Sequence, residues 1–415
     1  MIRFIAFLFI LLSPIAAAAG KTNISVNMNG NYFFEQLNKD SVLNPGNALD
    51  VESNVPNMRS DISAQYGNGE FNVKGAARYF LNPPFPVENS HALPSDRNVI
   101  FLDEANVEWK KDYEFKVVLG RQKFFWGPGF IKNPINLLNP PTDFRNPYFS
   151  LEEKSGVTGL SAAYYSGNWS ITGVIVPNFF QEKMTQSYAI GGNTEGDYIA
   201  ALKFDTLALG GDLTAVLYKI RTEKPEIGFA FSKMAGNVEV HGEALFQQGN
   251  RRIYIDPDDP EDPFQESFRN SDRIFGKYLI GLRYRSISGY DFLIEYYRDD
   301  TGYGSEQRDE FIDLLNDQRF LAPGNQLFWE DTLRRDYLFL RVGLTDILPK
   351  LSLNLLSVIN LDDGSVLTGS GLEYRISEKL KAYTDIRTSC GSEGSEFGMI
   401  PASYTISSGI KISII

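Results

Sequence analysis

The sequence predicts an all-β protein, a single closed antiparallel transmembrane β-barrel of about 18 strands, with 16 as the lower limit. Three observations lead to this prediction. Most of the chain after residue 20 alternates apolar and polar residues in segments the length of a membrane strand. No later segment approaches the roughly 18 uninterrupted apolar residues that a membrane helix needs. Long and short connections between the predicted strands also follow a regular order along the chain.

Residues 1–19 predict a signal peptide. Arg3 supplies the positive charge, Phe4 to Leu12 form a short apolar core, and Ala16 to Ala19 offer a cleavage site. The apolar core is too short to span a bilayer. We therefore expect an exported protein in which residues 20–415 form the barrel.

Composition excludes several classes of function. The net charge of -12, from 52 acidic and 40 basic residues, argues against a nucleic-acid partner. One cysteine, Cys390, rules out an intramolecular disulfide framework. Two histidines, His91 and His241, leave little for a histidine-built metal site or catalytic centre. We expect no cofactor, no metal and no enzyme activity.

The predicted strands have a period of two, and many run for about 10 to 13 residues, roughly twice the typical globular length. In residues 290–297, the side chains expected to face a wet lumen are Asp291 and Glu295, and those expected to face lipid are Tyr290, Phe292, Ile294 and Tyr296. No stretch keeps a helical period for more than two turns. Helices are therefore not expected.

The order of the connections favours a membrane barrel over other β-folds. Short turns, many of them rich in Gly and Asn, fall at 67–69, 111–113, 166–168, 235–237, 286–289 and 377–379. Long connections fall near 37–55, 82–97, 122–155, 177–196, 248–272, 300–334 and 389–402. Every long connection follows an odd-numbered strand, as in outer-membrane barrels with long extracellular loops and short periplasmic turns. A β-sandwich or propeller also alternates, but neither predicts this order. Both termini are then expected on the periplasmic side.

The polar phase of the strands predicts the residues that line the lumen. They are Glu104, Asn106, Glu108, Glu239, His241, Glu243, Lys277, Arg283, Arg285, Asp291, Glu295, Arg341, Glu373, Arg375, Lys381, Asp385 and Arg387. Acidic residues dominate the first half and basic residues the second, so opposed walls would create a transverse field. The alternative is that these charges only solvate a polar wall.

The third long connection, at about 122–155, is the candidate functional segment. It is far too rich in aromatic and aliphatic side chains to stay in water, and the sheltered surface available is the barrel interior. We expect it to fold inward and narrow the lumen, with polar side chains at the constriction, anchoring aromatic residues and a Gly-Pro-Gly turn. The residues concerned are Arg121, Lys123, Lys132, Asp143 and Arg145, then Phe125, Trp126 and Phe144, and Gly127, Pro128 and Gly129. Alternatively, the segment only plugs and braces the barrel. The strand parity of Arg121 matches that of lipid-facing Leu119, so it could instead reach toward headgroups.

The stretch "LGRQKFFWGPG", Leu119 to Gly129, resembles a motif of bacterial outer-membrane barrels at a strand-to-loop transition. Its Gly-Arg-Gln part looks like that of alginate-export barrels, and its Trp-Gly-Pro-Gly part looks like that of barrels implicated in capsule assembly. The resemblance implies an outer-membrane barrel, with outer-membrane lipid and lipopolysaccharide as its surroundings. The chain ends on Ile415, where a terminal Phe is usual in such proteins.

Three functions are compatible with this sequence. The first is a porin for passive diffusion of small hydrophilic solutes, and the second is a barrel that exports or anchors a polysaccharide. The third is an outer-membrane hydrolase, for which His91 beside Ser90 and Asp96 would be the candidate group. The oligomeric state stays open, because no sequence feature decides it.

Overall fold

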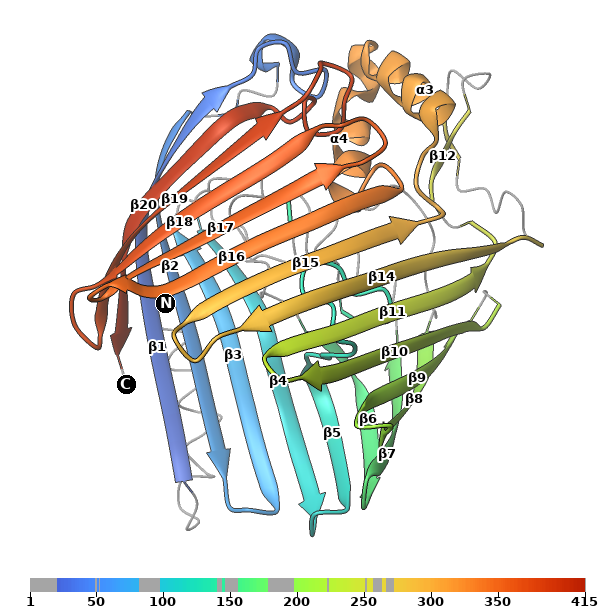
Figure 1. The fold of residues 1–415 in the computed structure, drawn as a ribbon, viewed down its shortest axis with the longest axis vertical. Coiled ribbons are helices and arrows are strands. Elements are labelled where there is room, and N and C mark those ends of the chain that lie inside the picture. The colour runs from blue at the N-terminus through green and yellow to red at the C-terminus, as the bar shows by residue number, and fades with distance from the viewer. Residues whose placement is uncertain are drawn as a thin grey trace.

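The computed structural model describes residues 21–48, 51, 53–81, 98–139, 144–145, 156–177, 198–221, 224–250, 252–256, 263–265 and 272–414. Eighteen strands of this part form one antiparallel sheet (Figure 1). They are β1 (Lys21–Leu37), β2 (Asn54–Gly67), β3 (Phe71–Leu81), β4 (Asn98–Lys111), β5 (Phe115–Gln122), β6 (Val157–Ser166), β7 (Trp169–Pro177), β8 (Tyr198–Ala208), β9 (Gly211–Ile220), β10 (Glu226–Ala235), β11 (Val238–Gln248), β14 (Ile274–Arg285), β15 (Tyr290–Asp299), β16 (Asp336–Leu348), β17 (Leu351–Asn360), β18 (Val366–Arg375), β19 (Leu380–Cys390) and β20 (Ala402–Ile414).

The sheet closes on itself. Each strand pairs with the next along the chain, and β1 pairs with both β2 and β20, with Val26 opposite Ile414. Closure leaves no strand edge, so every strand of the wall has a hydrogen-bonded neighbour on both sides, as a sheet in lipid requires. The prediction of a closed antiparallel barrel of about 18 strands is confirmed.

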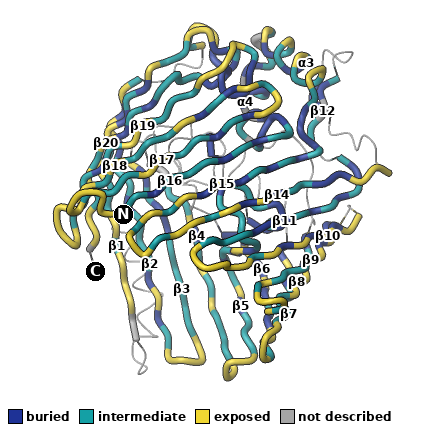
Figure 2. The backbone as a smooth tube through the Cα atoms, in the orientation of Figure 1, coloured by how far each residue is buried: buried dark blue, intermediate teal, exposed yellow. Residues whose placement is uncertain are grey.

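The order of long and short connections is also confirmed. The wall begins and ends at the rim of the short turns, because Lys21 lies opposite Gly67 and the amide of Ser413 donates to the carbonyl of Lys379. The short turns are exposed along this rim (Figure 2). The strand ends that border the long connections lie at the other rim, as an even-numbered meander dictates.

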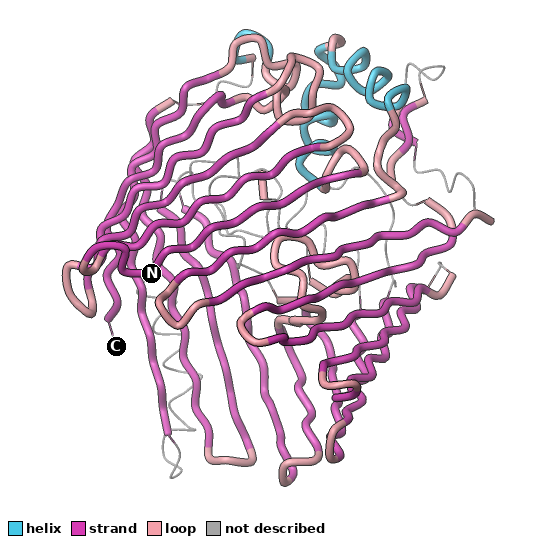
Figure 3. The backbone as a smooth tube through the Cα atoms, viewed as in Figure 1, coloured by secondary structure: helices cyan, strands magenta, loops and turns pink. Residues whose placement is uncertain are grey.

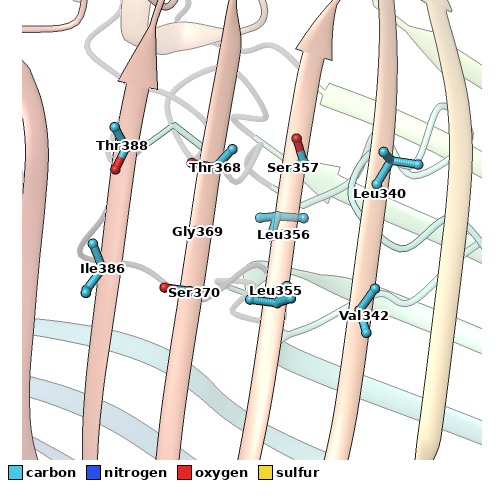
Figure 4. A pocket seen from close by; sticks show the side chains of 10 residues that line it. All are labelled: Leu340, Val342, Leu355, Leu356, Ser357, Thr368, Gly369, Ser370, Ile386 and Thr388. Carbon is cyan, nitrogen blue, oxygen red and sulfur yellow. The ribbon is translucent and has the colours of Figure 1, made fainter.

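The outer face of the wall is apolar. On β15 the exposed positions are Tyr290, Phe292 and Ile294. Glu295, which lies between Ile294 and Tyr296 in the strand, is fully buried. Figure 4 shows the same face on β16 to β19, where Leu340, Val342 and Ile386 border a shallow hollow of about 330 Å³. These side chains have the phase opposite to that of inward-facing Phe339. The hollow therefore belongs to the outer surface and not to the channel.

The connection between β15 and β16 contains two α-helices, α3 (Ser305–Leu315) and α4 (Leu321–Glu330), at the rim of the long loops (Figures 1 and 3). The expectation of no helix is wrong here. Pro323 lies in the first turn of α4, where its missing N–H costs no helical bond. Residues 305–315 are mostly polar, and only Phe311 and Leu315 are fully buried. Neither described helix is long and apolar enough to cross a membrane.

Smaller elements complete the described loops: a short hairpin, β12 (Tyr254–Ile255) with β13 (Phe264–Gln265), and two 3-10 turns, η1 (Pro45–Asn47) and η2 (Gln318–Phe320). A hydrophobic cluster joins these loops to the inner wall. It includes Leu43, Phe144, Phe311, Phe328, Phe339 and Phe397. The core of the molecule therefore lies inside the barrel, toward the rim of the long loops.

Candidate functional site

Residues 123–139, called here the inner loop, leave β5 and fold against the inner wall of the barrel (Figure 3). Two carboxylates of the wall bind its backbone. Glu243 on β11 accepts the amides of Gly129 (2.6 Å) and Ile135 (3.1 Å). Glu295 on β15 accepts those of Phe130 (2.8 Å) and Ile131 (3.2 Å). Hydrogen bonds to an ionised acceptor are among the stronger ones in proteins, so the inner loop is firmly attached.

The Gly-Pro-Gly turn allows this close approach to Glu243. Gly127 has a φ of +85°, which L side chains rarely adopt, and a Cβ there would lie 2.4 Å from Glu243 Oε1. A Cβ on Gly129 would lie 2.2 Å from the carbonyl oxygen of Lys132. Pro128 lies between them. Both glycines are therefore required for the carboxylate to reach the backbone.

Aromatic and aliphatic side chains anchor the inner loop on a neighbouring part of the wall. Phe124, Trp126, Ile135 and Leu138 join a buried cluster with Val174, Val176, Ile199 and Tyr218 of β7, β8 and β9. The ring centroids of Trp126 and Tyr218 lie 5.8 Å apart, and Lys203 Nζ lies 5.8 Å from the Trp126 ring. Ile175 and Leu217 have the other phase and are exposed, so this cluster lies within the barrel.

The tip of the inner loop meets a charged group on the wall. Arg341 and Arg283 lie with their Cζ atoms 4.5 Å and 5.5 Å from the centroid of the Phe130 ring. Asp291 accepts from Arg283 Nε at 2.8 Å and lies 3.5 Å from Arg341 Nη1. These cation–π contacts fix the tip beside β14, β15 and β16.

Lys132 links the inner loop to the connection that carries α4. Its Nζ lies 2.7 Å from Asp331, whose other oxygen lies 3.7 Å from Lys277 Nζ. Burial alone would raise the pKa of Asp331, but the charges of Lys132, Lys277 and Arg252 hold it well below its ordinary value. Asp331 therefore stays ionised and keeps the link in mildly acidic solution.

Arg145, beyond the inner loop, is completely buried. Its Nη1 donates to Glu396 at 3.0 Å and its Nη2 to the carbonyl of Asp331 at 2.7 Å. Glu396 also accepts from the amide of Leu333 (3.0 Å) and from Asn360 Nδ2 (2.8 Å). Burial raises the pKa of Glu396, and the charge of Arg145 opposes that rise. This ion pair ties three long connections together inside the rim.

Other residues predicted for the constriction lie elsewhere or point differently. Arg121 has the outward phase of Leu119, and its Nε donates to the carbonyl of Leu102 at 2.6 Å. Phe125, grouped with the anchoring aromatic residues, is instead 66% exposed. Lys123 Nζ lies 3.8 Å from Asp103. Asp143 lies outside the described residues.

The predicted lumen residues carry charge of both signs in close proximity. Several of them form ion pairs along the wall: Glu104 with Lys74 (2.7 Å), Glu108 with Lys110 (2.8 Å), Arg375 with Asp346 (3.0 Å) and Lys381 with Glu373 (2.7 Å). Arg387 donates to the carbonyl of Phe144 (3.4 Å), and Glu239 accepts from Ser232 (3.2 Å). Arg285 lies opposite Asp291, and Asp385 lies opposite Gly371. Paired opposite charges weaken the transverse field expected from the sequence.

His241 is a buried wall residue whose Nε2 lies 2.9 Å from Glu295. Within the described ranges, no group of three or more His, Cys, Asp or Glu side chains could hold a metal ion. His91, the candidate of the hydrolase reading, and the expected signal peptide lie outside the described residues.

Sequence reasoning missed two acids, Asp331 and Glu396, and two arginines, Arg59 and Arg78. Asp331 and Glu396 lie in long connections, where no local pattern indicates a partner in another loop. The arginines could have been found, since Arg59 shares the inward phase of β2 with Asp61 and Ser63.

The described strands define a closed 18-stranded antiparallel β-barrel, and a loop is attached to its inner wall. No protein-family model and no curated protein matches the sequence. Solved structures do. OccAB1 of Acinetobacter baumannii matches with a TM-score of 0.58 and 10% identity, covering 95% of this chain and 96% of that one. Pseudomonas aeruginosa OpdK, solved with vanillate, matches with a TM-score of 0.56 and 8% identity, covering 95% of this chain and 98% of that one. A BenF-like porin of Pseudomonas fluorescens Pf-5 matches with a TM-score of 0.55 and 10% identity, and it also covers 95% of this chain and 98% of that one. At such low identity the likeness shows a shared fold.

Proposed function

We propose that this protein is an integral outer-membrane channel for passive diffusion of small hydrophilic solutes, in which the inner loop narrows the lumen. One observation carries the proposal: four backbone amides of the inner loop are bound by two inward-facing carboxylates, Glu243 and Glu295. A loop attached in this way occupies part of the bore that an 18-stranded wall encloses.

The wall supports the proposed location. Its outer face is an apolar surface suited to lipid, and aromatic residues such as Trp169 and Tyr164 are exposed near the short turns. By analogy with barrels of this form, the short-turn rim and both termini would face the periplasm. The long connections would then face outward, next to lipopolysaccharide.

The similar structures favour a channel over an enzyme. The BenF-like protein is described as a porin. Among the described residues, His241 is only 1% exposed, so a solute in the lumen cannot reach it as a general base requires. A polysaccharide exporter or anchoring barrel is the alternative, and a lumen sealed by the loops would favour it.

Purified protein in planar lipid bilayers tests the proposal. We expect stable, stepwise ionic currents in KCl and larger steps when residues 124–138 are replaced by a short Gly-Ser linker. A folded barrel that gives no steps yet retains polysaccharide would refute the channel. Steps of unchanged size after the replacement would refute narrowing by the inner loop.

A further inference from the structure

We propose that the lumen beside β1 to β4 contains a binding subsite for a small, uncharged, polyhydroxylated solute of monosaccharide size. The inference rests on the proposed channel function and names a solute class for it. It is based on a cavity next to the start of the inner loop, on the polar groups that line the cavity, and on one exposed aromatic ring.

The cavity has a volume of about 220 Å³ and is lined by Ser25, Asn27, Arg59, Asp61, Arg78 and Lys123, among others. This volume equals about seven water molecules at roughly 30 Å³ each. It is below the roughly 300–1,000 Å³ of pockets for drug-sized ligands. A single sugar ring is therefore the size of solute that the cavity suits. A polymer would have to pass it one residue at a time.

Donors and acceptors are interleaved in the lining. Arg59 Nε donates to Asp61 at 2.9 Å, and Arg78 donates to Asp103 through Nε (2.8 Å) and Nη2 (2.7 Å). Ser25 and Ser63 join their hydroxyls at 2.8 Å, and the Asn27 side chain next to them is exposed to the lumen. A solute hydroxyl both donates and accepts, so it matches guanidinium N–H groups and carboxylate oxygens placed side by side.

A carboxylate solute matches the lining less well. It only accepts hydrogen bonds, and it would meet the oxygens of Asp61 and Asp103 at close range. Both arginines already pair with these acids, which lowers the positive field that would attract an anion. Lys123 adds one cation, and it lies 3.8 Å from Asp103. The lining therefore carries three cations and two carboxylates, a net charge of +1 with both arginines paired.

Phe125, two residues after the cavity-lining Lys123, exposes an aromatic ring. Phe124 and Trp126 on either side of it both enter the buried cluster on β7 to β9, whereas Phe125 is 66% exposed. In an extended segment, successive side chains project to opposite sides, so Phe125 would point away from the wall that Phe124 and Trp126 contact. It then shares the side of Lys123, which lines the cavity. A flat ring next to interleaved donors and acceptors suits the C–H face and the hydroxyl edge of a sugar.

Saturation-transfer NMR of the detergent-solubilised full barrel with D-glucose, in a sugar-free detergent, tests this inference. We expect magnetisation transfer to D-glucose, with Phe125→Ala and Asn27→Leu each raising its apparent Kd by roughly twofold to tenfold. Phe229→Ala is the matched control, because Phe229 is 51% exposed on the outer face of β10. Circular dichroism would verify that each variant keeps its β-structure.

Each outcome decides the inference. Absence of transfer, or equal transfer in the wild type and both lumen variants, would overturn it. Sodium D-glucuronate should displace D-glucose less effectively than unlabelled D-glucose does. If glucuronate instead displaced it at a lower concentration, Lys123 would select anions, and the assignment of an uncharged solute would be overturned. The assay needs no ionic current, so it is independent of the bilayer experiment. A barrel that binds D-glucose but gives no current would refute the channel and leave the subsite standing.

Discussion

Replacing Glu243 by alanine should release the inner loop. The carboxylate is 4% exposed and accepts two backbone amides, from Gly129 at 2.6 Å and from Ile135 at 3.1 Å. Both amides would lose a charged acceptor in a place with little access to water. The substitution therefore weakens the attachment without altering the loop's own sequence.

The magnitude follows from these two bonds. A hydrogen bond to a charged group contributes about 1.5–3 kcal/mol, so two bonds give about 3–6 kcal/mol. Since each 1.4 kcal/mol is a factor of ten, the released state becomes roughly 10²- to 10⁴-fold more populated. Glu295, with its own two amide bonds, should hold part of the loop in place. We therefore expect transient opening in Glu243→Ala and a lasting change when Glu295→Ala is added.

Single-channel recording measures this effect directly. Glu243→Ala should give noisier currents and excursions to a larger conductance, and the double variant should give a steady larger conductance. Glu239→Gln is the control for loss of a carboxylate from the same strand; Glu239 accepts from Ser232 and lies opposite Arg283 of β14. Currents of Glu243→Ala that match the wild type in size and noise would refute the attachment role of Glu243.

Four further predictions concern the inner loop and the ion pairs that join the long connections. Trp126→Ala should destabilise the barrel by about 3–5 kcal/mol through loss of a large buried side chain, while Phe125→Ala should leave the thermal midpoint close to that of the wild type; equal midpoints for the two variants would contradict the assigned burial. Arg145→Met should cost about 3–5 kcal/mol because it leaves Glu396 buried without its cation, and Arg145→Met with Glu396→Gln should recover part of that loss in urea unfolding. Gly127→Ala should loosen the loop, because its φ is +85° and the new Cβ would lie 2.4 Å from Glu243 Oε1; protection of the loop amides in hydrogen exchange would fall, and unchanged protection would argue against strain there. Folding lowers the pKa of the Asp331 carboxyl from 3.8. The ionised carboxylate therefore stabilises the fold at every pH above its pKa in the unfolded chain, and this stabilisation is lost as the pH falls through its lower pKa in the folded protein. The difference in thermal midpoint between wild type and Asp331→Asn should stay constant from pH 7 to about 5 and shrink below about 4.

Local pattern was enough to predict the wall. Alternation placed Tyr290 and Phe292 outside and Glu295 inside, because successive residues of a strand face opposite sides. The order of loop lengths then predicted an even-numbered closed meander. The helices were missed because residues 305–315 have only a narrow apolar stripe and because Pro323 and Gly324 conceal the start of α4.

The partners of the inner loop could not be predicted in the same way. Glu243 and Gly129 are 114 residues apart in sequence, and Arg145 and Glu396 are 251 residues apart. Such contacts depend on the register and curvature of many strands between them, and a shift by one residue would exchange the two faces. Phe125 shows the limit within one short stretch, since the sequence grouped it with the anchoring aromatic residues and it is 66% exposed. The outward phase of Arg121, in contrast, could be read from strand parity.

The sequence alone determined that this chain forms a closed β-wall with long loops at one rim and an apolar, aromatic loop after the fifth strand. These properties depend on short-range alternation and on connection length, which can be read along the chain. The tertiary structure decided where that loop attaches and which carboxylates hold it. Those outcomes depend on distant residues that meet only when the barrel closes.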